Sequence, residues 1–277
     1  NKSVFFFDDV IVRLGSDIRC DDKNNPIQTT LFQNNLNGDK SMPMYINSDN
    51  KITDFPYKCT DDNITWIIDP YNNGYYIPNS SELNIYRDTQ HSRDGGNKID
   101  TSGEYATAYL DHGKAPKSAS YEYAIKVQTT PQEMAHFSKN PTYKVLQQDS
   151  IAHIVKNNIS NAVGYAIFDA DKYSGKDFIL SADTPVLAMV KENDAKNVSL
   201  YLSDPDLRLP YIEDLDELNS GEERPSTMKV ATIKINGEWE IDGASEGVKI
   251  VKSKDGKTTL AFDCIDGLTI SVNLKVK

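Results

Sequence analysis

Pro26-Ile27-Gln28-Thr29-Thr30-Leu31-Phe32-Gln33 lies between two segments that are rich in aromatic and β-branched residues. The segment before it is Phe-Phe-Phe-Asp-Asp-Val-Ile-Val at residues 5–12, and the segment after it is Ile-Thr-Trp-Ile-Ile-Asp at residues 64–69. Side chains of these types are enriched in strands because they pack well on a pleated surface. The sequence on both sides therefore predicts β structure.

Similar runs of alternating or β-branched residues recur along the chain, with turn-forming residues between them. They cover residues 4–14, 66–68, 75–77, 121–127, 143–146, 151–155, 163–168, 186–190, 198–202, 228–235, 248–251, 258–262 and 268–276. Residues 69–74 and 254–257 are rich in Asn, Asp and Gly, which favours hairpin turns. The pattern predicts an all-β protein with antiparallel strands.

One helix start is convincing, at Thr130-Pro131-Gln132-Glu133. Thr can cap the helix, Pro fits its first turn, and Glu can reach back to the amide of the capping residue. A short helix over residues 131–138 is predicted.

The chain length of 277 residues favours two domains. A polar turn at residues 181–185, Ser-Ala-Asp-Thr-Pro, predicts a linker, which gives domains of residues 1–183 and 184–277. Within the second domain, the acidic segment 211–218 is predicted to be an exposed loop or a short helix.

The formal net charge of −11 argues against a nucleic-acid partner, because such binding draws on a basic face. The same objection applies to a polyanionic glycan unless basic residues gather locally. Candidates in the first half of the chain are Arg13, Arg19, Arg87, Arg93, Lys98, Lys114 and Lys117. No segment approaches the roughly 20 apolar residues of a membrane-spanning helix, so no membrane partner is expected.

The three cysteines, Cys20, Cys59 and Cys264, form no metal-binding motif. From the sequence, a disulfide between Cys20 and Cys59 is possible. No motif calls for a cofactor. The acidic pairs could hold a structural calcium ion, although adjacent residues of a strand point to opposite faces. These pairs are Asp8-Asp9, Asp21-Asp22 and Asp61-Asp62.

Common catalytic motifs are missing from the sequence. It has neither the Gly-x-Ser-x-Gly elbow of hydrolases nor a phosphate-binding Gly-x-x-x-x-Gly-Lys loop. Of the four histidines, His153 lies in a predicted strand and is expected to be packed or paired, whereas His112, before Gly113, is the best functional candidate.

Residues 26–33 also resemble the β region of polysaccharide lyase family 8, which includes chondroitin and hyaluronan lyases. In the chondroitin ABC lyases of this family the stretch reads as a Glu followed by Thr-Thr-Leu-Phe-Gln, and the Glu is an active-site residue. Here that position is Gln28. Further matches in the same order lie at residues 15–18, 74–77, 111–113, 119–123 and 143–146.

The resemblance implies a central antiparallel super-sandwich followed by a smaller C-terminal antiparallel β-sandwich. It also implies β-elimination at the uronic acid of a sulfated glycosaminoglycan, by His, Tyr and Arg of an N-terminal α/α toroid that faces the β region. The chain would then be a secreted or periplasmic fragment, inactive without the toroid. Gln28 would take the catalytic position, and substrate contacts would come from Gln33, Arg87, Arg93 and His112.

Two other functions stay open from the sequence. One is a non-catalytic carbohydrate-binding or structural β module, in which Trp66, Tyr71, Tyr75 and Tyr76 either stack on sugar rings or pack in the core. The other is a sugar mutarotase of similar sandwich topology, for which no pair of His and Glu residues is evident. Gln28 itself can also be read as a polar residue at a strand edge.

Overall fold

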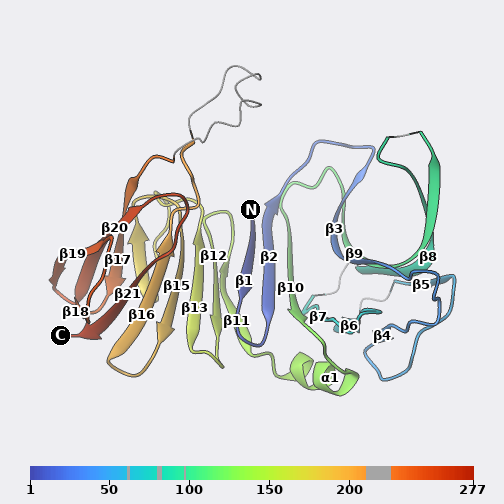
Figure 1. The fold of residues 1–277 in the computed structure, drawn as a ribbon, viewed down its shortest axis with the longest axis horizontal. Helices are drawn as coiled ribbons and strands as arrows, with labels where there is room; N and C mark the ends of the chain where they lie inside the picture. Colours follow the sequence, from blue (N-terminus) through green and yellow to red (C-terminus); the bar gives the residue numbers. More distant parts are fainter. Residues whose placement is uncertain (61–62, 80–82, 97, 210–225) are drawn as a thin grey trace. The chain divides into compact units, whose positions relative to one another are not determined.

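The protein forms two compact units, Asn1–Thr142 and Tyr143–Lys277, hereafter the N-terminal unit and the C-terminal unit. The computed structural model describes residues 1–60, 63–79, 83–96, 98–209 and 226–277. Figure 1 shows the strands of both units along the chain.

The boundary between the units lies at residues 142 and 143, about 40 residues before the predicted boundary at 183 and 184. Residues 143–183 include strands that pair in one sheet with later strands of the C-terminal unit. Hydrogen-bonded strands of one sheet share its core, which is why these residues belong to the C-terminal unit. The polar turn at 181–185 connects two strands within that unit, and the acidic segment 211–218 lies outside the described residues.

The N-terminal unit contains a six-stranded and a four-stranded antiparallel sheet. The first has the order β1 (Lys2–Phe6), β2 (Ile11–Ile18), β10 (Ala119–Lys126), β7 (Gly74–Tyr76), β6 (Trp66–Ile68) and β4 (Tyr45–Ile46). The second has the order β3 (Pro26–Asn35), β9 (Asp100–Lys114), β8 (Leu83–Arg93) and β5 (Tyr57–Cys59). The periodic runs of the sequence predicted the strands of the first sheet except β4, and they missed the strands of the second sheet.

The C-terminal unit contains a seven-stranded and a four-stranded antiparallel sheet. The first has the order β11 (Tyr143–Gln148), β12 (Ala152–Asn157), β13 (Ala162–Ile167), β15 (Val186–Glu192), β16 (Asn197–Ser203), β21 (Ile270–Val276) and β18 (Trp239–Ile241). The second has the order β14 (Ile179–Ala182), β17 (Lys229–Asn236), β20 (Lys257–Cys264) and β19 (Val248–Lys254). The predicted antiparallel all-β fold is confirmed.

Each unit buries a core between its two sheets, and in the N-terminal unit a second cluster forms where Met134 of α1 packs with Trp66 and Ile68 of β6. In the N-terminal unit, side chains of the four-stranded sheet pack with Tyr121 and Tyr123 of β10. In the C-terminal unit, Tyr165 and Val190 of the larger sheet pack with Phe262 of the smaller one. Both are sandwiches in which inward apolar residues alternate with outward polar ones.

The local signals at the helix and the turns are confirmed. The helix α1 (Pro131–Lys139) begins after Thr130, whose side chain accepts from the Glu133 amide while the Glu133 carboxylate accepts from the Thr130 amide. In the turn at 69–74, the buried Asp69 carboxylate accepts from the Tyr71 and Asn73 amides, at 2.8 and 2.9 Å.

Several predicted features of individual side chains are now resolved. All three cysteines, Cys20, Cys59 and Cys264, are free thiols, so no disulfide joins Cys20 to Cys59. His153 is fully buried with its ring edge-on to Phe168, as expected for a packed histidine. Burial lowers the pKa of the His153 imidazole to about 4.

Gly15 permits a close approach of the Tyr121 ring in the N-terminal unit. A Cβ atom at position 15 would lie 2.2 Å from the Tyr121 Cε1 atom. The ring is buried and packs beside Tyr123 and His112, so it cannot swing away freely.

We therefore expect Gly15→Ala to lower the free energy of unfolding of the N-terminal unit by about 1–3 kcal/mol, through overpacking. The chain has two tryptophans, Trp66 in the N-terminal unit and Trp239 in the C-terminal unit. In a Trp239→Phe background, denaturant titration followed by Trp66 fluorescence reports the N-terminal unit. Gly95→Ala is the control, because its new Cβ meets nothing within 4 Å. Equal stability of the two variants would contradict the packing role of Gly15.

Candidate functional site

The outward face of the β3-β9-β8 sheet carries a continuous set of polar side chains. Alternation along β9 turns Ala106, Ala108 and Leu110 into the core and leaves Thr107 and Tyr109 on the other face. The outward residues include Gln28 and Gln33 of β3, Tyr86 and Gln90 of β8, and Thr107 and Tyr109 of β9, hereafter the polar sheet face. Asp88 and Asp111 lie on the same side of the sheet. The structure thus brings together two predicted site residues, Gln28 and Gln33.

Gln28 is exposed on β3, and a hydrogen bond joins its side chain to that of Tyr109. Its direct cross-strand neighbour is Asp111. Burial raises the pKa of the Tyr109 hydroxyl, and the neighbouring Asp111 raises it further, whereas the bond to Gln28 lowers it. Tyr109 therefore stays protonated at neutral pH and offers an O–H donor.

Gln90 of β8 connects Gln33 of β3 with Thr107 of β9, at the end of the polar sheet face away from Gln28. Its Nε2 atom donates to the Thr107 hydroxyl at 2.9 Å, and its Oε1 atom accepts from Gln33 Nε2. The Tyr86 ring lies edge-on to Tyr109, with 6.0 Å between ring centroids. These contacts hold amide and hydroxyl groups in fixed positions, as sugar hydroxyls require.

A hollow of about 370 Å³ continues from the polar sheet face toward β5. Its lining combines aromatic rings, an amide and two charges of opposite sign. It is formed by Pro56, Tyr57, Lys58, Asn84, Ile85, Tyr86, Asp88 and Tyr109. A ring face beside hydrogen-bonding groups is suited to a sugar, whose C–H face is apolar and whose edge is polar.

Arg87 was predicted to contact substrate, but it points into the core of the N-terminal unit and is fully buried. Its Nη1 atom donates to the Met42 carbonyl at 2.7 Å and its Nη2 atom to the Lys40 carbonyl at 2.6 Å. It lies on β8 opposite the small Ala106, which leaves room for the guanidinium. Arg87 therefore fixes the backbone of residues 40–42 and is not exposed to a ligand.

Two other predicted contacts lie away from Gln28. Arg93 is at the far end of β8, where it pairs with Asp100 at 3.6 Å. His112 faces the opposite side of the sheet, and its Nε2 atom lies 2.8 Å from the Thr29 hydroxyl. Alternation along β9 separates it from Tyr109, so it shares no face with Gln28.

Of the basic residues considered from the first half of the chain, Arg19 and Lys117 line one hollow together with Asp21, and each is paired with a carboxylate. Arg19 pairs with Asp17 at 2.6 Å, and Lys117 pairs with Asp21 at 2.8 Å. Arg13 lies over the Tyr123 ring, 5.5 Å from its centroid.

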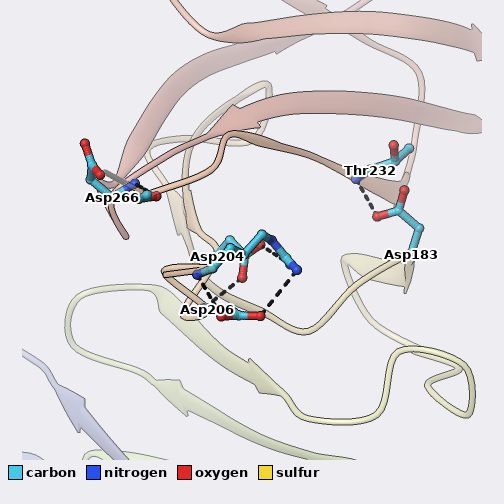
Figure 2. A network of polar contacts seen from close by, with 7 residues as sticks. Asp183, Asp204, Asp206, Thr232 and Asp266 are labelled. Atoms are coloured by element: carbon cyan, nitrogen blue, oxygen red, sulfur yellow. Dashed lines mark hydrogen bonds and ion pairs between the residues drawn. The ribbon is translucent and has the colours of Figure 1, made fainter. Parts of the chain in front are cut away.

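Acidic residues of the C-terminal unit accept hydrogen bonds from backbone amides and from an arginine side chain of the same unit (Figure 2). Asp204, nearly fully buried, accepts from Arg208 at 2.7 Å, and Asp183 accepts from the Thr232 amide at 2.7 Å. Over the described parts of the chain, no three His, Cys, Asp or Glu side chains cluster as a metal site would. Asp61 and Asp62 lie outside those parts, so structural calcium stays a prediction.

Comparison with known proteins identifies the family. The sequence model described as "Polysaccharide lyase family 8, super-sandwich domain" matches residues 1–138, and the one described as "Polysaccharide lyase family 8, C-terminal beta-sandwich domain" matches residues 144–208. The chain belongs to polysaccharide lyase family 8. The gap between the two lyase matches coincides with the boundary between the structural units.

Individual relatives agree with this family. The chain is 30% identical to chondroitin sulfate ABC endolyase of Proteus vulgaris, over 99% of its length and 26% of that protein. It is 31% identical to chondroitin sulfate ABC exolyase of Bacteroides thetaiotaomicron, over 99% of its length and 27% of that protein. It thus spans about a quarter of the length of these curated relatives.

A solved structure of Paenibacillus xanthan lyase shares the fold. It matches 100% of this chain and 26% of that chain, with a TM-score of 0.80 at 19% identity. In the described part of the 277-residue chain, no helix has the length and apolar character needed to cross a membrane.

Sequence reasoning missed Tyr86, Gln90, Thr107 and Tyr109. Their strands mix Thr, Asn, Gln and Ser with small residues, which hides the apolar period. Alternate spacing of Asn84, Tyr86 and Asp88 was the one signal that could have placed them on a single face.

The structural role of Arg87 gives a second expectation. Arg87→Met keeps the apolar stem but leaves the Lys40 and Met42 carbonyls without their donor, so the N-terminal unit should lose roughly 2–4 kcal/mol of unfolding free energy. Arg93→Met breaks the exposed pair with Asp100 and should change stability by at most about 1 kcal/mol. Trp66 fluorescence in the Trp239→Phe background measures both. A loss as small for Arg87→Met as for Arg93→Met would contradict this assignment.

Proposed function

We propose that the chain is the β portion of a glycosaminoglycan lyase that cleaves chondroitin or dermatan sulfate by β-elimination. The proposal is supported by membership in polysaccharide lyase family 8 and by the chondroitin sulfate ABC lyases among its relatives. The observation that carries it is the polar sheet face, where Gln28 lies beside Tyr109. The sequence resemblance is what aligns Gln28 with the family's Glu.

In this proposal the polar sheet face is one wall of the substrate cleft, and an N-terminal α/α toroid supplies the other. A base on the toroid removes the proton at C5 of the uronic acid, and the bond from C4 to the leaving oxygen breaks. The leaving oxygen takes up a proton, and a double bond forms between C4 and C5.

The residues of this chain position the sugar. Tyr109 donates a hydrogen bond, and the amides of Gln28 and Gln33 both donate and accept. Gln28 retains the shape of a Glu without its charge, so it cannot stabilise a positive charge on a neighbouring base. Its neighbour Asp111 gives a physical reason for the amide, since two carboxylates directly opposite on adjacent strands repel.

In this proposal the chain acts on its polymer together with an α/α toroid, and without one it should not turn over substrate. We also propose a secreted or periplasmic location, because a large charged polymer does not cross a membrane to reach an enzyme inside the cell.

The rival is a sugar-binding module that stacks Trp66, Tyr71, Tyr75 and Tyr76 on its ligand. Of these, Tyr71 is exposed, and its hydroxyl donates to the Asn35 carbonyl at 2.7 Å. Trp66 and Tyr75 do not favour the rival. Both side chains are buried, at 3% and 7% exposure, and pack in the hydrophobic core. Tyr76 packs edge-on to Phe137. No specific observation supports a mutarotase.

The test is the ultraviolet absorbance of chondroitin sulfate, because the new double bond is conjugated with the carboxylate and hydrolysis does not create it. The chain alone should give no rise. Joined to its toroid, it should give a rise that Gln28→Glu increases at least about tenfold, since a carboxylate can support the base and an amide cannot.

Gln132→Glu is the matched control, because it adds the same charge on the exposed surface of α1. It should leave the rate unchanged. Cleavage without a gain in absorbance would contradict β-elimination. A rise with the purified chain alone would place the base within this chain and contradict the need for the toroid.

A further inference from the structure

The four-stranded sheet of the C-terminal unit carries a concentration of lysines on its outward face. Its inward residues, such as Leu260 and Phe262, are fully buried in the core of the unit. The outward positions of β17, β20 and β19 carry five exposed lysines, hereafter the lysine face: Lys234, Lys249, Lys252, Lys254 and Lys257. These strands lie side by side in Figure 1.

The strand register places these lysines close together. Lys252 is opposite Thr259, which is opposite Lys234, so the two lysines lie two strands apart, at about 10 Å. Lys254 is directly opposite Lys257 at the next position along the hairpin. Like charges in direct cross-strand contact are destabilising unless something of opposite charge offsets them.

Two carboxylates, Asp255 and the outward Asp263 of β20, lie beside these five lysines, so their charge is offset only in part. The Lys254 Nζ atom lies 4.0 Å from the Asp255 Oδ2 atom, and Asp255 is a residue of the hairpin turn. In the portion of the chain that the structure describes, Lys234, Lys249, Lys252 and Lys257 form no ion pair. The concentration stands out because the whole chain has a net charge of −11.

Most outward residues between the lysines are short or polar, and Val230 and Val251 are exposed apolar exceptions. Thr232, Thr259 and Ala261 occupy the centre of the sheet, and the face carries no aromatic ring among its described residues. The surface is therefore a flat array of point charges with hydroxyl groups between them. Such an array suits an extended polyanion, because a small anion needs donors that converge on one spot.

We infer that the lysine face binds a sulfated polysaccharide chain, as an anchoring surface separate from the polar sheet face. The inference rests on the proposed function only for the choice of polymer. Lysine gives a hydrated point charge without the fixed fork of arginine, so it holds a polymer without fixing its register. An anchor of that kind lets the polymer slide while it stays bound. Nucleic acid is disfavoured by the net charge and by the lack of stacking rings on this face.

The test is the affinity of the 277-residue chain for chondroitin sulfate, measured by isothermal titration calorimetry between about 50 and 200 mM salt. The variant Lys249→Gln/Lys252→Gln/Lys257→Gln removes three charges from the lysine face. Lys144→Gln/Lys191→Gln/Lys196→Gln is the control, because it removes three exposed charges elsewhere in the same unit. Trp239 fluorescence confirms that both variants keep the C-terminal unit folded.

We expect the lysine-face variant to bind roughly tenfold or more weakly, with a shallower salt dependence, and the control to bind within about twofold of the parent chain. Equal losses in the two variants would overturn the inference. So would a single-stranded DNA that binds as tightly as chondroitin sulfate. Gln132→Glu, on the exposed surface of α1 in the N-terminal unit, should leave this affinity unchanged. The binding assay needs no cleavage, so the absorbance assay and the binding assay fail independently.

Discussion

The register of β9 between β3 and β8 is the constraint on which the N-terminal unit depends. Inward Ala106 and Ala108 let the neighbouring side chains close over the core, and outward Thr107 and Tyr109 build the polar sheet face. A slip of one residue would exchange the two sets and expose the core. Arg87 adds to this constraint, because it ties β8 to the backbone of residues 40–42.

Two surfaces with different chemistry follow from the two sandwiches. The polar sheet face offers fixed amides and hydroxyls beside aromatic rings, which favours recognition of individual sugars. The lysine face offers spread positive charge without directional groups, which favours retention of a polyanion.

The sequence predicted the features that depend on local chemistry. The cap at Thr130, the Asp69 turn and the packed His153 are all confirmed, because each depends on a few adjacent residues or on one strand. The antiparallel class also followed from the apolar runs. The domain boundary did not, since a polar turn looks alike whether it separates two units or joins two strands of one.

The candidate site was only partly predictable. Resemblance located Gln28 and Gln33. The strand register decides which face of the sheet each side chain occupies, and it puts Gln28 and His112 on opposite faces. Arg87 was placed on the surface because arginine is rarely buried, and burial here depends on the carbonyls of residues 40–42, far away in sequence. The lysine face needs three strands to be aligned and is invisible in any one of them.

The most direct test of the central claim is nuclear magnetic resonance of the tyrosine-labelled chain during titration with a chondroitin sulfate tetrasaccharide, at a salt concentration that suppresses the lysine face. Tyr86→Phe and Tyr109→Phe assign the two signals. The account predicts shifts for Tyr86 and Tyr109, while the buried core residues Tyr75 and Tyr123 stay unchanged. Saturable shifts of other tyrosines, with Tyr86 and Tyr109 unmoved, would contradict the polar sheet face as the sugar-binding wall.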